Sequence, residues 1–280
     1  MPVKKTTKTV TKTTTKKPSK SSKGNQIKIY SWNVNGIRAI EKKGFRDWIN
    51  NCAGDIVCLQ ETKAQPDQIT DSLKNIGSYK SYWFSAQKKG YSSVAIYSTI
   101  EPQAIVNGLN VEKFDVEGRV IFAEYDKFVL ANVYFPNGGR GPERVEFKLD
   151  FYDGLFYYLN RNFKGRKGII VTGDYNTAHQ DIDLAKPDRW SKVSGYLPEE
   201  RKWIDHIVNL GYTDVFRLFN KEGGQYTYWD QISRSRDRNE GWRIDYFMVS
   251  NEFVPYVKDC RIYPEIMGSD HCPISVTIEV

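Results

Sequence analysis

Short apolar runs recur along this chain, and each one ends at a polar residue. The segments DIVCLQE (55–61) and GIIVTGD (168–174) are the clearest examples. These runs lack the alternation of a strand with one solvated face and are typical of strands that are covered on both faces. Such strands need layers of other elements above and below their sheet. We therefore predict an α/β fold.

Helical periodicity between these runs indicates the covering layers. Phe45, Trp48, Ile49 and Cys52 recur at i, i+3, i+4 and i+7, and they predict a helix with one buried face. A long helix is expected over 145–159, after Gly141-Pro142. A third helix has Trp203, Ile204, Ile207 and Val208 on its apolar face.

Further segments predict strands. They cover 27–34, 92–98, 119–125, 127–135, 242–250 and 273–280, with a hairpin through Asp126-Lys127. Because the predicted strands outnumber the helices, we expect a sheet-centred domain with stacked sheets.

Residues 1–25 differ in composition from the rest of the chain. They hold eight lysines, no acidic residue and almost no large apolar side chain. Such a segment buries too little surface to offset its ordering entropy, so we predict a disordered tail followed by a single domain over 26–280. Subtracting the eight lysine charges from the net charge of +7 leaves −1 for that domain. The tail is interpreted either as an arm that attracts DNA or as a solubilising segment, and its lack of arginine argues against a mitochondrial transit peptide.

The four cysteines, at positions 52, 58, 260 and 272, form no CxxC pair. This spacing supports neither a zinc site nor a disulfide framework, and we expect buried free thiols in a reducing compartment. The chain has no apolar run long enough to cross a membrane and no apolar core of a signal peptide. An intracellular protein without a membrane partner is therefore expected.

Polar side chains interrupt or end five of the strand-like segments. They are Asn33 and Asn35, Glu61, Asn137 and Arg140, Asp174 and Asn176, and Asp245. One such residue alone is usually a cap or a turn residue. Ligands of α/β sheets gather at strand ends, so five such segments, with Asp270-His271 as a sixth group, predict one shared site.

Three residues of this set are acids that suit a metal ion, namely Glu61, Asp174 and Asp270. Mg²⁺ is a hard cation that proteins bind through one or two carboxylates together with water. A magnesium site with Asn, His, Tyr and Arg nearby is suited to phosphoryl chemistry, because the metal and the cationic donors neutralise charge on phosphate oxygens. We therefore expect Mg²⁺ as the cofactor, with Mn²⁺ as a substitute.

The segment GSDHCP near the end of the chain contains His271, one of only three histidines. Adjacent side chains of an extended segment point to opposite sides, so a nucleophilic pair of His271 and Cys272 is disfavoured and Cys272 is expected to be buried. Asp270 faces away from His271 for the same reason. His271 then needs another acid to fix its tautomer, and Asp245 is the candidate.

Seven segments together resemble the exonuclease III family of abasic-site endonucleases. They are SWNVNGIRA, LQETKA, GYSSVAIYS, YFPNGG, GDYNTAHQDIDL, GWRIDYF and GSDHCP, and the resemblance covers residues 26–280. LQE and SDH alone are shared with the wider deoxyribonuclease I-like superfamily, whereas GDYNTAHQDIDL and GWRIDYF are more specific to the DNA-repair branch. The resemblance implies a four-layered sandwich of two stacked mixed β-sheets flanked by helices.

The resemblance also implies a role for the metal-binding and water-activating residues. Glu61 would hold the magnesium with help from Asn33 and Asp270, and Asn35 would lie near them. Many relatives carry Asp at the position of Asn35. Asp174 would orient or deprotonate the attacking water, and Asn176 would position it.

Other matched residues would contact the substrate. His271, held by Asp245, would donate to a phosphate oxygen, and Tyr134 and Asn137 would contact the scissile phosphate. Tyr228, Trp242 and Ile244 resemble the wall of a pocket for a flipped-out abasic sugar, which has no stacking to lose and so flips at low cost. Arg140 would reach into the duplex. Tyr91, with Lys88 and Lys89, matches a loop that contacts the DNA backbone, although Ser93 replaces its usual Gly.

The expected function is therefore that of a monomeric, magnesium-dependent DNA repair endonuclease. It would cleave double-stranded DNA 5′ to an abasic site, leave a 3′-hydroxyl, trim 3′-blocking groups and act as a weak 3′→5′ exonuclease. We expect it to be located with the DNA, in a nucleoid or a nucleus. Two alternatives are a phosphatase or phosphodiesterase acting on inositol phosphates or lipids, and a catalytically silent DNA-binding protein on the same scaffold.

Overall fold

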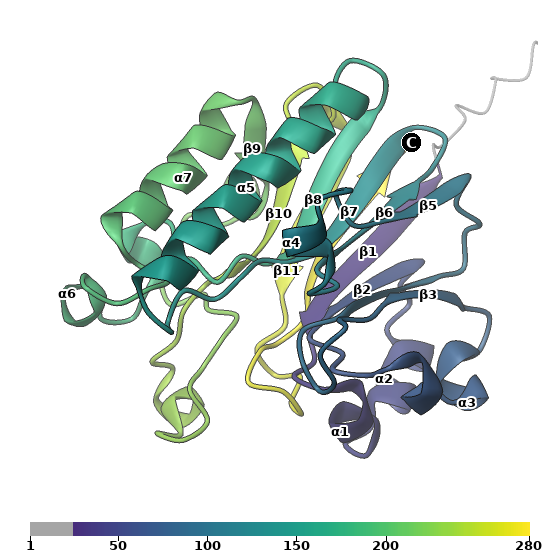
Figure 1. Cartoon of the computed structure of the whole chain (residues 1–280), viewed down its shortest axis with the longest axis horizontal. Coiled ribbons are helices and arrows are strands. Elements are labelled where there is room, and N and C mark those ends of the chain that lie inside the picture. The colour runs from purple at the N-terminus through teal and green to yellow at the C-terminus, as the bar shows by residue number, and fades with distance from the viewer. Residues whose placement is uncertain (1–24) are drawn as a thin grey trace, which may run out of the picture.

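The computed structural model describes residues 25–280 (Figure 1). Within this range, strands form two six-stranded mixed sheets with the orders β11-β12-β1-β2-β4-β3 and β5-β6-β7-β8-β10-β9. The first sheet consists of β1 Gln26–Asn33, β2 Ile56–Gln60, β3 Lys80–Phe84, β4 Val94–Ser98, β11 Val257–Ile262 and β12 Ile274–Glu279. The second consists of β5 Ala104–Asn107, β6 Val120–Glu124, β7 Phe128–Tyr134, β8 Gly168–Asp174, β9 Tyr212–Asp214 and β10 Asp245–Ser250.

The two sheets pack against each other through an apolar core. Ile29 and Ile96 of the first sheet belong to the same buried cluster as Leu130, Ile170 and Phe247 of the second. Every residue of β2 and of β8 is buried, as the two apolar runs predict. Burial on both faces follows because each sheet is covered by its partner on one side and by helices on the other.

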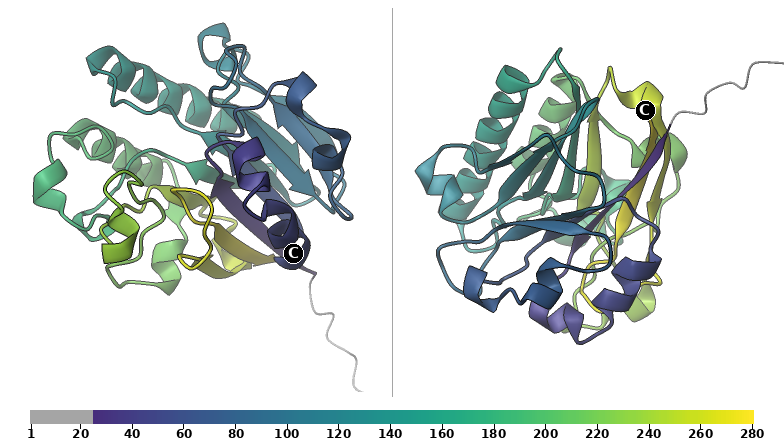
Figure 2. Two further views of the ribbon diagram at one scale, coloured as in Figure 1. Left: turned by 90° about the horizontal axis from the view of Figure 1, so that it is seen from below. Right: turned by 90° about the vertical axis from the view of Figure 1, so that its right-hand side faces the viewer.

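Helices cover the two outer faces of the sheet pair. The first sheet is covered by α1 Ile37–Glu41, α2 Phe45–Asn51 and α3 Asp71–Lys74, and the second by α5 Pro142–Asn162 and α7 Pro198–Asn209. The short elements are α4 Glu112–Asp115, α6 Pro187–Trp190, α8 Phe216–Phe219 and the 3₁₀ helices Pro66–Gln68, Asp181–Asp183, Ser235–Arg238 and Val254–Tyr256. Figure 2 shows the two main helix groups on opposite sides of the strands. The predicted α/β class and the four-layered sandwich are thus confirmed.

Most predicted elements are present, and the differences have simple physical reasons. The β6–β7 hairpin and helices α2, α5 and α7 are confirmed. The strands without a prediction, β3, β5, β9 and β11, are all sheet edges, where one side faces solvent or loops and the apolar signal is weak. Val208 was expected on the buried face of α7, but it is 42% exposed because the buried stripe follows Glu200, Ile204 and Ile207 and leaves Val208 at its margin.

Smaller outcomes concern the cysteines, Asp245 and the tail. Cys58, Cys260 and Cys272 are buried as expected, whereas Cys52 is only half-buried because it follows the last residue of α2. Asp245 begins β10 and does not interrupt it. The basic tail expected over 1–25 lies, except for Asn25, outside the described residues. Across residues 25–280, no helix combines the length and the apolar character that a membrane span requires.

Candidate active site

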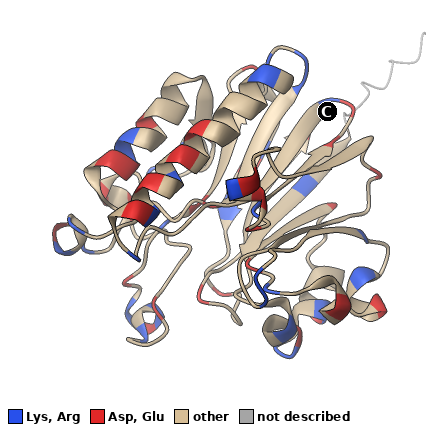
Figure 3. Cartoon of the chain, viewed as in Figure 1, with Lys and Arg blue, Asp and Glu red and all other residues tan. Residues whose placement is uncertain are grey.

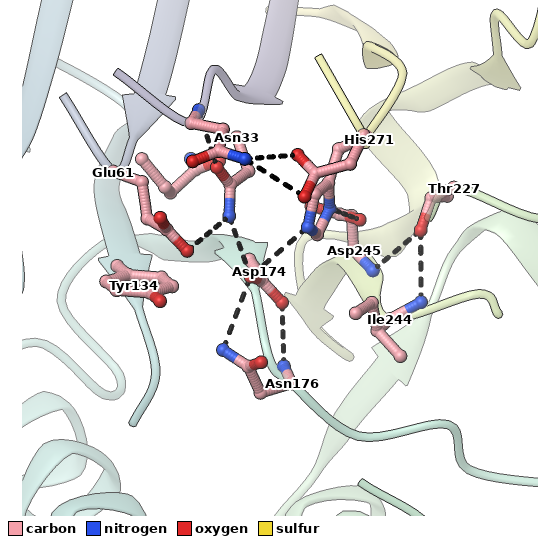
Figure 4. Close-up of polar contacts among 12 residues, drawn as sticks. Asn33, Glu61, Tyr134, Asp174, Asn176, Thr227, Ile244, Asp245 and His271 are labelled. Atoms are coloured by element: carbon pink, nitrogen blue, oxygen red, sulfur yellow. Dashed lines mark hydrogen bonds and ion pairs between the residues drawn. The ribbon is translucent and has the colours of Figure 1, made fainter. Parts of the chain in front are cut away.

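Strand direction brings the polar strand ends to one edge of the sandwich (Figure 4). β1 and β2 run parallel in one sheet and β7 and β8 run parallel in the other, so each pair presents its C-terminal ends together. β10 runs antiparallel to β8 with Asp245 opposite Asp174, so the start of β10 reaches the same edge. Asn33 Nδ2 donates to Asp174 Oδ2 over 2.9 Å and joins the two sheets. The strand ends predicted to share a site therefore lie together.

Asp174 is the buried carboxylate at the centre of this group. It is 1% exposed, and the backbone N–H of Asn176 donates to its Oδ1 over 2.8 Å. The Asn176 side chain donates to Oδ2 over 3.3 Å, which places Asn176 as the sequence predicts. Burial, reinforced by the charge of Asp245, outweighs the attraction of His271 and raises the pKa of Asp174 to about 7. A carboxylate with such a pKa is suited to accept a proton near neutral pH.

His271 and Asp245 form the predicted pair beside Asp174. His271 Nδ1 lies 2.8 Å from Asp245 Oδ2, and His271 Nε2 lies 3.8 Å from Asp174 Oδ2. Burial disfavours the charged imidazole, but attraction to Asp245 and Asp174 outweighs it and raises the pKa of His271 to about 10. Thr227 Oγ1 accepts from the backbone N–H groups of Ile244 and Asp245 and fixes the start of β10. The imidazole is therefore protonated at neutral pH and can donate from Nε2.

Glu61 lies on the other side of Asn33. Asn33 Nδ2 donates to Glu61 Oε1 over 3.2 Å, and the Lys63 ammonium lies 2.8 Å from Glu61 Oε2. Burial acts to raise the pKa of Glu61, but the charge and hydrogen bond of Lys63 outweigh burial and lower it. Asn35 Nδ2 donates to both oxygens of Asp270, at 3.1 and 3.0 Å. The four residues assigned to the metal from sequence thus form one contiguous set, and the Asp270 and His271 side chains have separate partners as expected.

Two groups of side chains could hold a metal ion, and the oxygens around Glu61 fit a hard cation better than the second group does. In that second group, one ligand atom each from Asp174, Asp245 and His271 lies within 4.8 Å of the others. His271 there is protonated and bonded to Asp245, so the group already holds its own positive charge, whereas a metal needs a neutral imidazole. The set around Glu61 offers carboxylate and amide oxygens, the ligands that Mg²⁺ prefers, and it already attracts the ammonium of Lys63.

Several site residues have left-handed backbone conformations. The φ angles are 47° at Asn35, 52° at Glu61, 51° at Lys63 and 51° at Asn176. Non-glycine residues in this region cost free energy and persist only where the surrounding structure imposes them. Each of these residues follows a strand closely, so the sharp turn directs its side chain towards the shared edge.

A cavity of about 490 Å³ opens directly on this cluster. Its lining includes Glu61, Asp174, Asp270 and His271 at one end and Tyr228, Trp242 and Ile244 at its side. The Tyr228 ring centroid lies 4.9 Å from the His271 ring, and backbone hydrogen bonds between Tyr228 and Trp242 tie the two wall residues together. The ring of Trp190 lies 5.4 Å from Trp242 and extends this wall. All three predicted wall residues therefore face the candidate active site, while Trp229 packs in the core at 2% exposure.

Tyr134 and Asn137 also line the cavity. Asn137 Nδ2 donates to Asn176 Oδ1 over 2.8 Å, so Asn137 is coupled to the group that holds Asp174. Burial, together with the nearby Glu61 charge, raises the pKa of the Tyr134 hydroxyl well above its usual value, so the hydroxyl stays protonated. The guanidinium of Arg119 lies 4.7 Å from the centre of the Tyr134 ring and supports it from behind.

Arg140 and Tyr91 do not line the cavity. Arg140 is exposed on the loop between β7 and α5, several residues beyond the end of β7, and it does not join the residues that line the cavity. Its contact with the duplex stays a prediction. The Tyr91 hydroxyl accepts from Arg119 over 2.9 Å and from Arg144 over 3.0 Å. Lys88 Nζ lies 5.6 Å from the Tyr91 ring centre, and both lysines of that loop are exposed.

Sequence reasoning missed Lys63 and Trp190 as parts of the site, and it missed the buried Lys148, whose ammonium donates to the backbone carbonyl of Asn176. Lys63 stands two residues after Glu61 in a loop, where a lysine is ordinarily solvated, and the left-handed backbone at both residues leaves no strand period that could place their side chains together. Trp190 belongs to a short helix with no periodic signal. Lys148 lies on the same helical stripe as Tyr152, Leu155 and Leu159. This spacing could have predicted from sequence that Lys148 is buried.

The structure has two stacked mixed sheets, and their shared edge holds buried carboxylates, a protonated histidine and a set of oxygens that attracts a cation. This fold and site define a hydrolase of phosphate esters. The chain belongs to the Endonuclease/Exonuclease/phosphatase family, which it matches over residues 30–271. The resemblance to the exonuclease III family of abasic-site endonucleases is confirmed by the relatives below, and the protein is a hydrolytic nuclease of DNA repair.

Three similar proteins illustrate this relationship. An exodeoxyribonuclease of Bacillus subtilis is 39% identical over 256 residues, which are 91% of this chain and all of that protein. The crystal structure of an AP endonuclease from Leishmania major is 31% identical and superposes with a TM-score of 0.82, covering 91% of this chain and 88% of the other. A 3′ phosphatase from Neisseria, solved with product DNA hairpin, is 27% identical with a TM-score of 0.84, covering 91% of this chain and all of the other.

Proposed function

We propose that this protein is a magnesium-dependent endonuclease that hydrolyses the phosphodiester 5′ to an abasic site in duplex DNA and leaves a 3′-hydroxyl. The observation that carries the proposal is the junction of a phosphoryl-transfer cluster with an aromatic-walled cavity of about 490 Å³. The cluster supplies a base, a protonated donor and a cation site, and the cavity supplies room for an extruded sugar. The relationship to exodeoxyribonucleases and AP endonucleases supports DNA as the substrate.

Asp174 is the residue that activates the attacking water. Its carboxylate is held by Asn33 and Asn176, so it cannot rotate away when a phosphate enters. Its raised pKa of about 7 makes the ionised form a better proton acceptor than an ordinary aspartate. Asp174 therefore orients the water and takes its proton as the water oxygen bonds to phosphorus. The bond between phosphorus and the 3′ oxygen breaks, and that oxygen takes a proton from solvent to become the 3′-hydroxyl.

His271, Tyr134 and Asn137 stabilise the phosphate. The protonated His271 donates from Nε2 to a non-bridging oxygen, and Asp245 on Nδ1 holds the ring in place and balances its charge. The Tyr134 hydroxyl and the Asn137 amide are neutral donors on the same cavity wall. Glu61, with Asn33 and Asp270, would hold the Mg²⁺, which would supply Lewis-acid neutralisation of negative charge on the phosphate.

Loops at the cavity mouth provide the DNA contacts that the net charge of the domain does not predict. Lys186, Arg189 and Arg238 line the cavity, and Figure 3 colours Lys and Arg positions in blue along the ribbon of the loop around α6 and of the loop below it. Ile232 is 96% exposed on the 230–239 loop, and the three arginines of this loop, at 234, 236 and 238, follow it in sequence. The basic groups would bind phosphates, and the apolar tip would press against the base stack beside the extruded sugar.

A cleavage assay tests the proposal. The full-length protein is incubated with 5′-labelled duplexes that carry an abasic analogue, uracil or no lesion, with magnesium or with a chelator. We expect magnesium-dependent cleavage 5′ to the abasic analogue and a product that a DNA polymerase extends directly. Equal cleavage of all three duplexes, or turnover of inositol phosphates in preference to DNA, would refute it.

Trimming of 3′-blocking groups, with weak 3′→5′ exonuclease activity, is a second activity that we propose for the same site. A phosphate at a 3′ end presents the same phosphorus to Asp174 and His271 without a need for sugar extrusion. The similarity to the Neisseria 3′ phosphatase supports this extension. A duplex with a recessed 3′-phosphate tests it through release of inorganic phosphate.

Glu61→Gln should weaken the metal and leave the DNA contacts in place. The substitution keeps the shape but removes the charge that attracts the cation, so we expect half-maximal activity to require at least about tenfold more magnesium, with duplex affinity within about twofold. Magnesium titrations of activity and fluorescence anisotropy of labelled duplex in chelator measure the two effects. Glu101→Gln, which breaks a similar but exposed lysine pair, is the control. An unchanged magnesium requirement in Glu61→Gln would show that the metal binds elsewhere.

Trp242→Ala should open the wall of the cavity and reduce selectivity. Shape rejection by such a wall is worth about 1–3 kcal/mol, so we expect the preference for abasic over undamaged duplex to fall by about 10- to 100-fold. Ratios of kcat/KM on the two duplexes measure it. Trp83→Ala, which truncates a half-buried tryptophan on β3, controls for loss of stability, and both variants need a thermal melt first. Equal loss on both substrates would mean that Trp242 only supports the fold.

A further inference from the structure

A fully buried lysine and a fully buried glutamate form an ion pair behind the candidate active site. Lys148 of α5 and Glu200 of α7 are each 0% exposed, and Lys148 Nζ lies 2.7 Å from Glu200 Oε1. The same ammonium donates to the backbone carbonyl of Asn176 over 2.7 Å. Lys148 therefore holds the residue whose backbone and side chain both bind Asp174.

Glu200 holds a neighbouring segment of the cavity wall. Its Oε1 accepts from Ser194 Oγ over 2.8 Å, and its Oε2 accepts from the backbone N–H groups of Gly195 over 2.6 Å and Leu197 over 3.1 Å. Ser194 and Gly195 line the cavity, and a Cβ on Gly195 would meet the Trp242 ring at 3.2 Å. Glu200 thus fixes the segment against which Trp242 rests.

The two segments also contact each other directly. The backbone N–H of Ala178 donates to the carbonyl of Gly195 over 2.8 Å. Residues 174–178, which include Asp174 and Asn176, are therefore hydrogen-bonded to residues 193–197 of the cavity wall. Both segments are also hydrogen-bonded to the same buried ion pair. A displacement of either segment must break at least one of these bonds.

Stability alone does not explain an ion pair at this position. Removing two charges from water is costly, and well-packed apolar residues of similar volume often replace a buried ion pair without loss of stability. The stripe of α5 that contains Lys148 is otherwise apolar, with Tyr152, Leu155 and Leu159, so an apolar residue would suit the helix. What an apolar pair would lack is the set of hydrogen bonds to Asn176 and to residues 194–197.

We propose that Lys148 and Glu200 are positioning residues that set the distance between the water-activating carboxylate and the wall of the substrate cavity. The inference rests on the proposed function, because it assigns to the pair the alignment of an extruded sugar with Asp174. Lys148 draws the Asn176 carbonyl towards α5, and Glu200 draws the 193–197 segment towards the same point. Substrate binding, which uses surface phosphate contacts, does not depend on the pair, whereas attack geometry does.

The test uses full-length protein and compares three enzymes on the abasic duplex. The double variant Lys148→Met/Glu200→Gln leaves no buried charge and keeps an acceptor for Gly195 and Leu197. The control double variant Lys113→Met/Asp150→Asn removes an exposed ion pair, 2.7 Å long, that also involves α5 but no site residue. Thermal melts set the assay temperature below the lowest Tm, and kcat, KM and the ratio of abasic to undamaged cleavage are then measured.

We expect kcat of the Lys148/Glu200 double variant to fall by about 10- to 100-fold, because misplacement of a reacting group by about 1 Å costs a factor of this size. KM should stay within about threefold, the discrimination ratio should fall, and the control variant should match the wild type. If the double variant does not fold, Lys148→Gln/Glu200→Gln, which also leaves no buried charge, serves as the second variant, with the same expected change in kcat. A folded variant with wild-type kcat and discrimination would overturn the inference. Absence of cleavage by the wild type would refute the proposed function instead.

Discussion

Asp174→Asn should lower kcat for cleavage of an abasic duplex by about 10²- to 10⁴-fold, the size expected when a positioned general base is lost. Asparagine keeps the shape of the side chain and can still accept from the Asn176 backbone, but it cannot take a proton. Duplex affinity should change by less than about threefold, because affinity rests on phosphate contacts outside the cluster. Single-turnover rates and anisotropy titrations separate the two effects.

The pH dependence of the wild type checks the same assignment. The ionised form of Asp174 is the active one, and its pKa is raised to about 7. Activity should therefore fall about tenfold per pH unit as the pH decreases below that value. Asp126→Asn, at an exposed hairpin tip, should reproduce the wild-type profile. Activity of Asp174→Asn within about tenfold of the wild type would assign water activation to another group.

Asp245→Asn should move the alkaline limb of the pH–rate profile towards lower pH. The protonated His271 is the donor, so activity is retained below its pKa of about 10 and lost as the pH rises through that value. Asp245 is the strongest of the groups that raise this pKa, so loss of its carboxylate should lower the pKa of His271. At neutral pH, kcat should fall by about 10²-fold, the size of losing one positioned donor to the developing charge, because Asp245 no longer holds the imidazole in place.

A double-mutant cycle tests whether the two residues act together. If Asp245 acts through the imidazole, then Asp245→Asn combined with His271→Asn should be little slower than the slower single variant, because groups that act as a unit are not additive. Fully multiplicative losses in kcat, or an alkaline limb that stays in place in Asp245→Asn, would separate Asp245 from His271.

Much of the site could be predicted from sequence because its residues stand where strands end. A buried strand is visible as a short apolar run, and a polar residue at its end is visible as a break in that run, as at Glu61 and Asp174. The opposite directions of Asp270 and His271 follow from the period of two in an extended segment. The residue types at these strand ends predicted phosphoryl chemistry. The prediction of an abasic-site endonuclease came from the resemblance of seven motifs to the exonuclease III family.

Sequence determined the local properties of this protein: which segments are strands or helices, which face of each is apolar, and which polar side chains stand at strand ends. Tertiary structure decided everything that depends on distances between segments far apart in the chain. Asn33 meets Asp174 only because two sheets stack, and Lys148 meets Glu200 and Asn176 only because α5 and α7 cover the second sheet. Arg140, by contrast, is near Asn137 in sequence but lies outside the cavity. The physical reason is that side-chain period is a property of one element, whereas the position of a buried charge depends on how several elements pack around it.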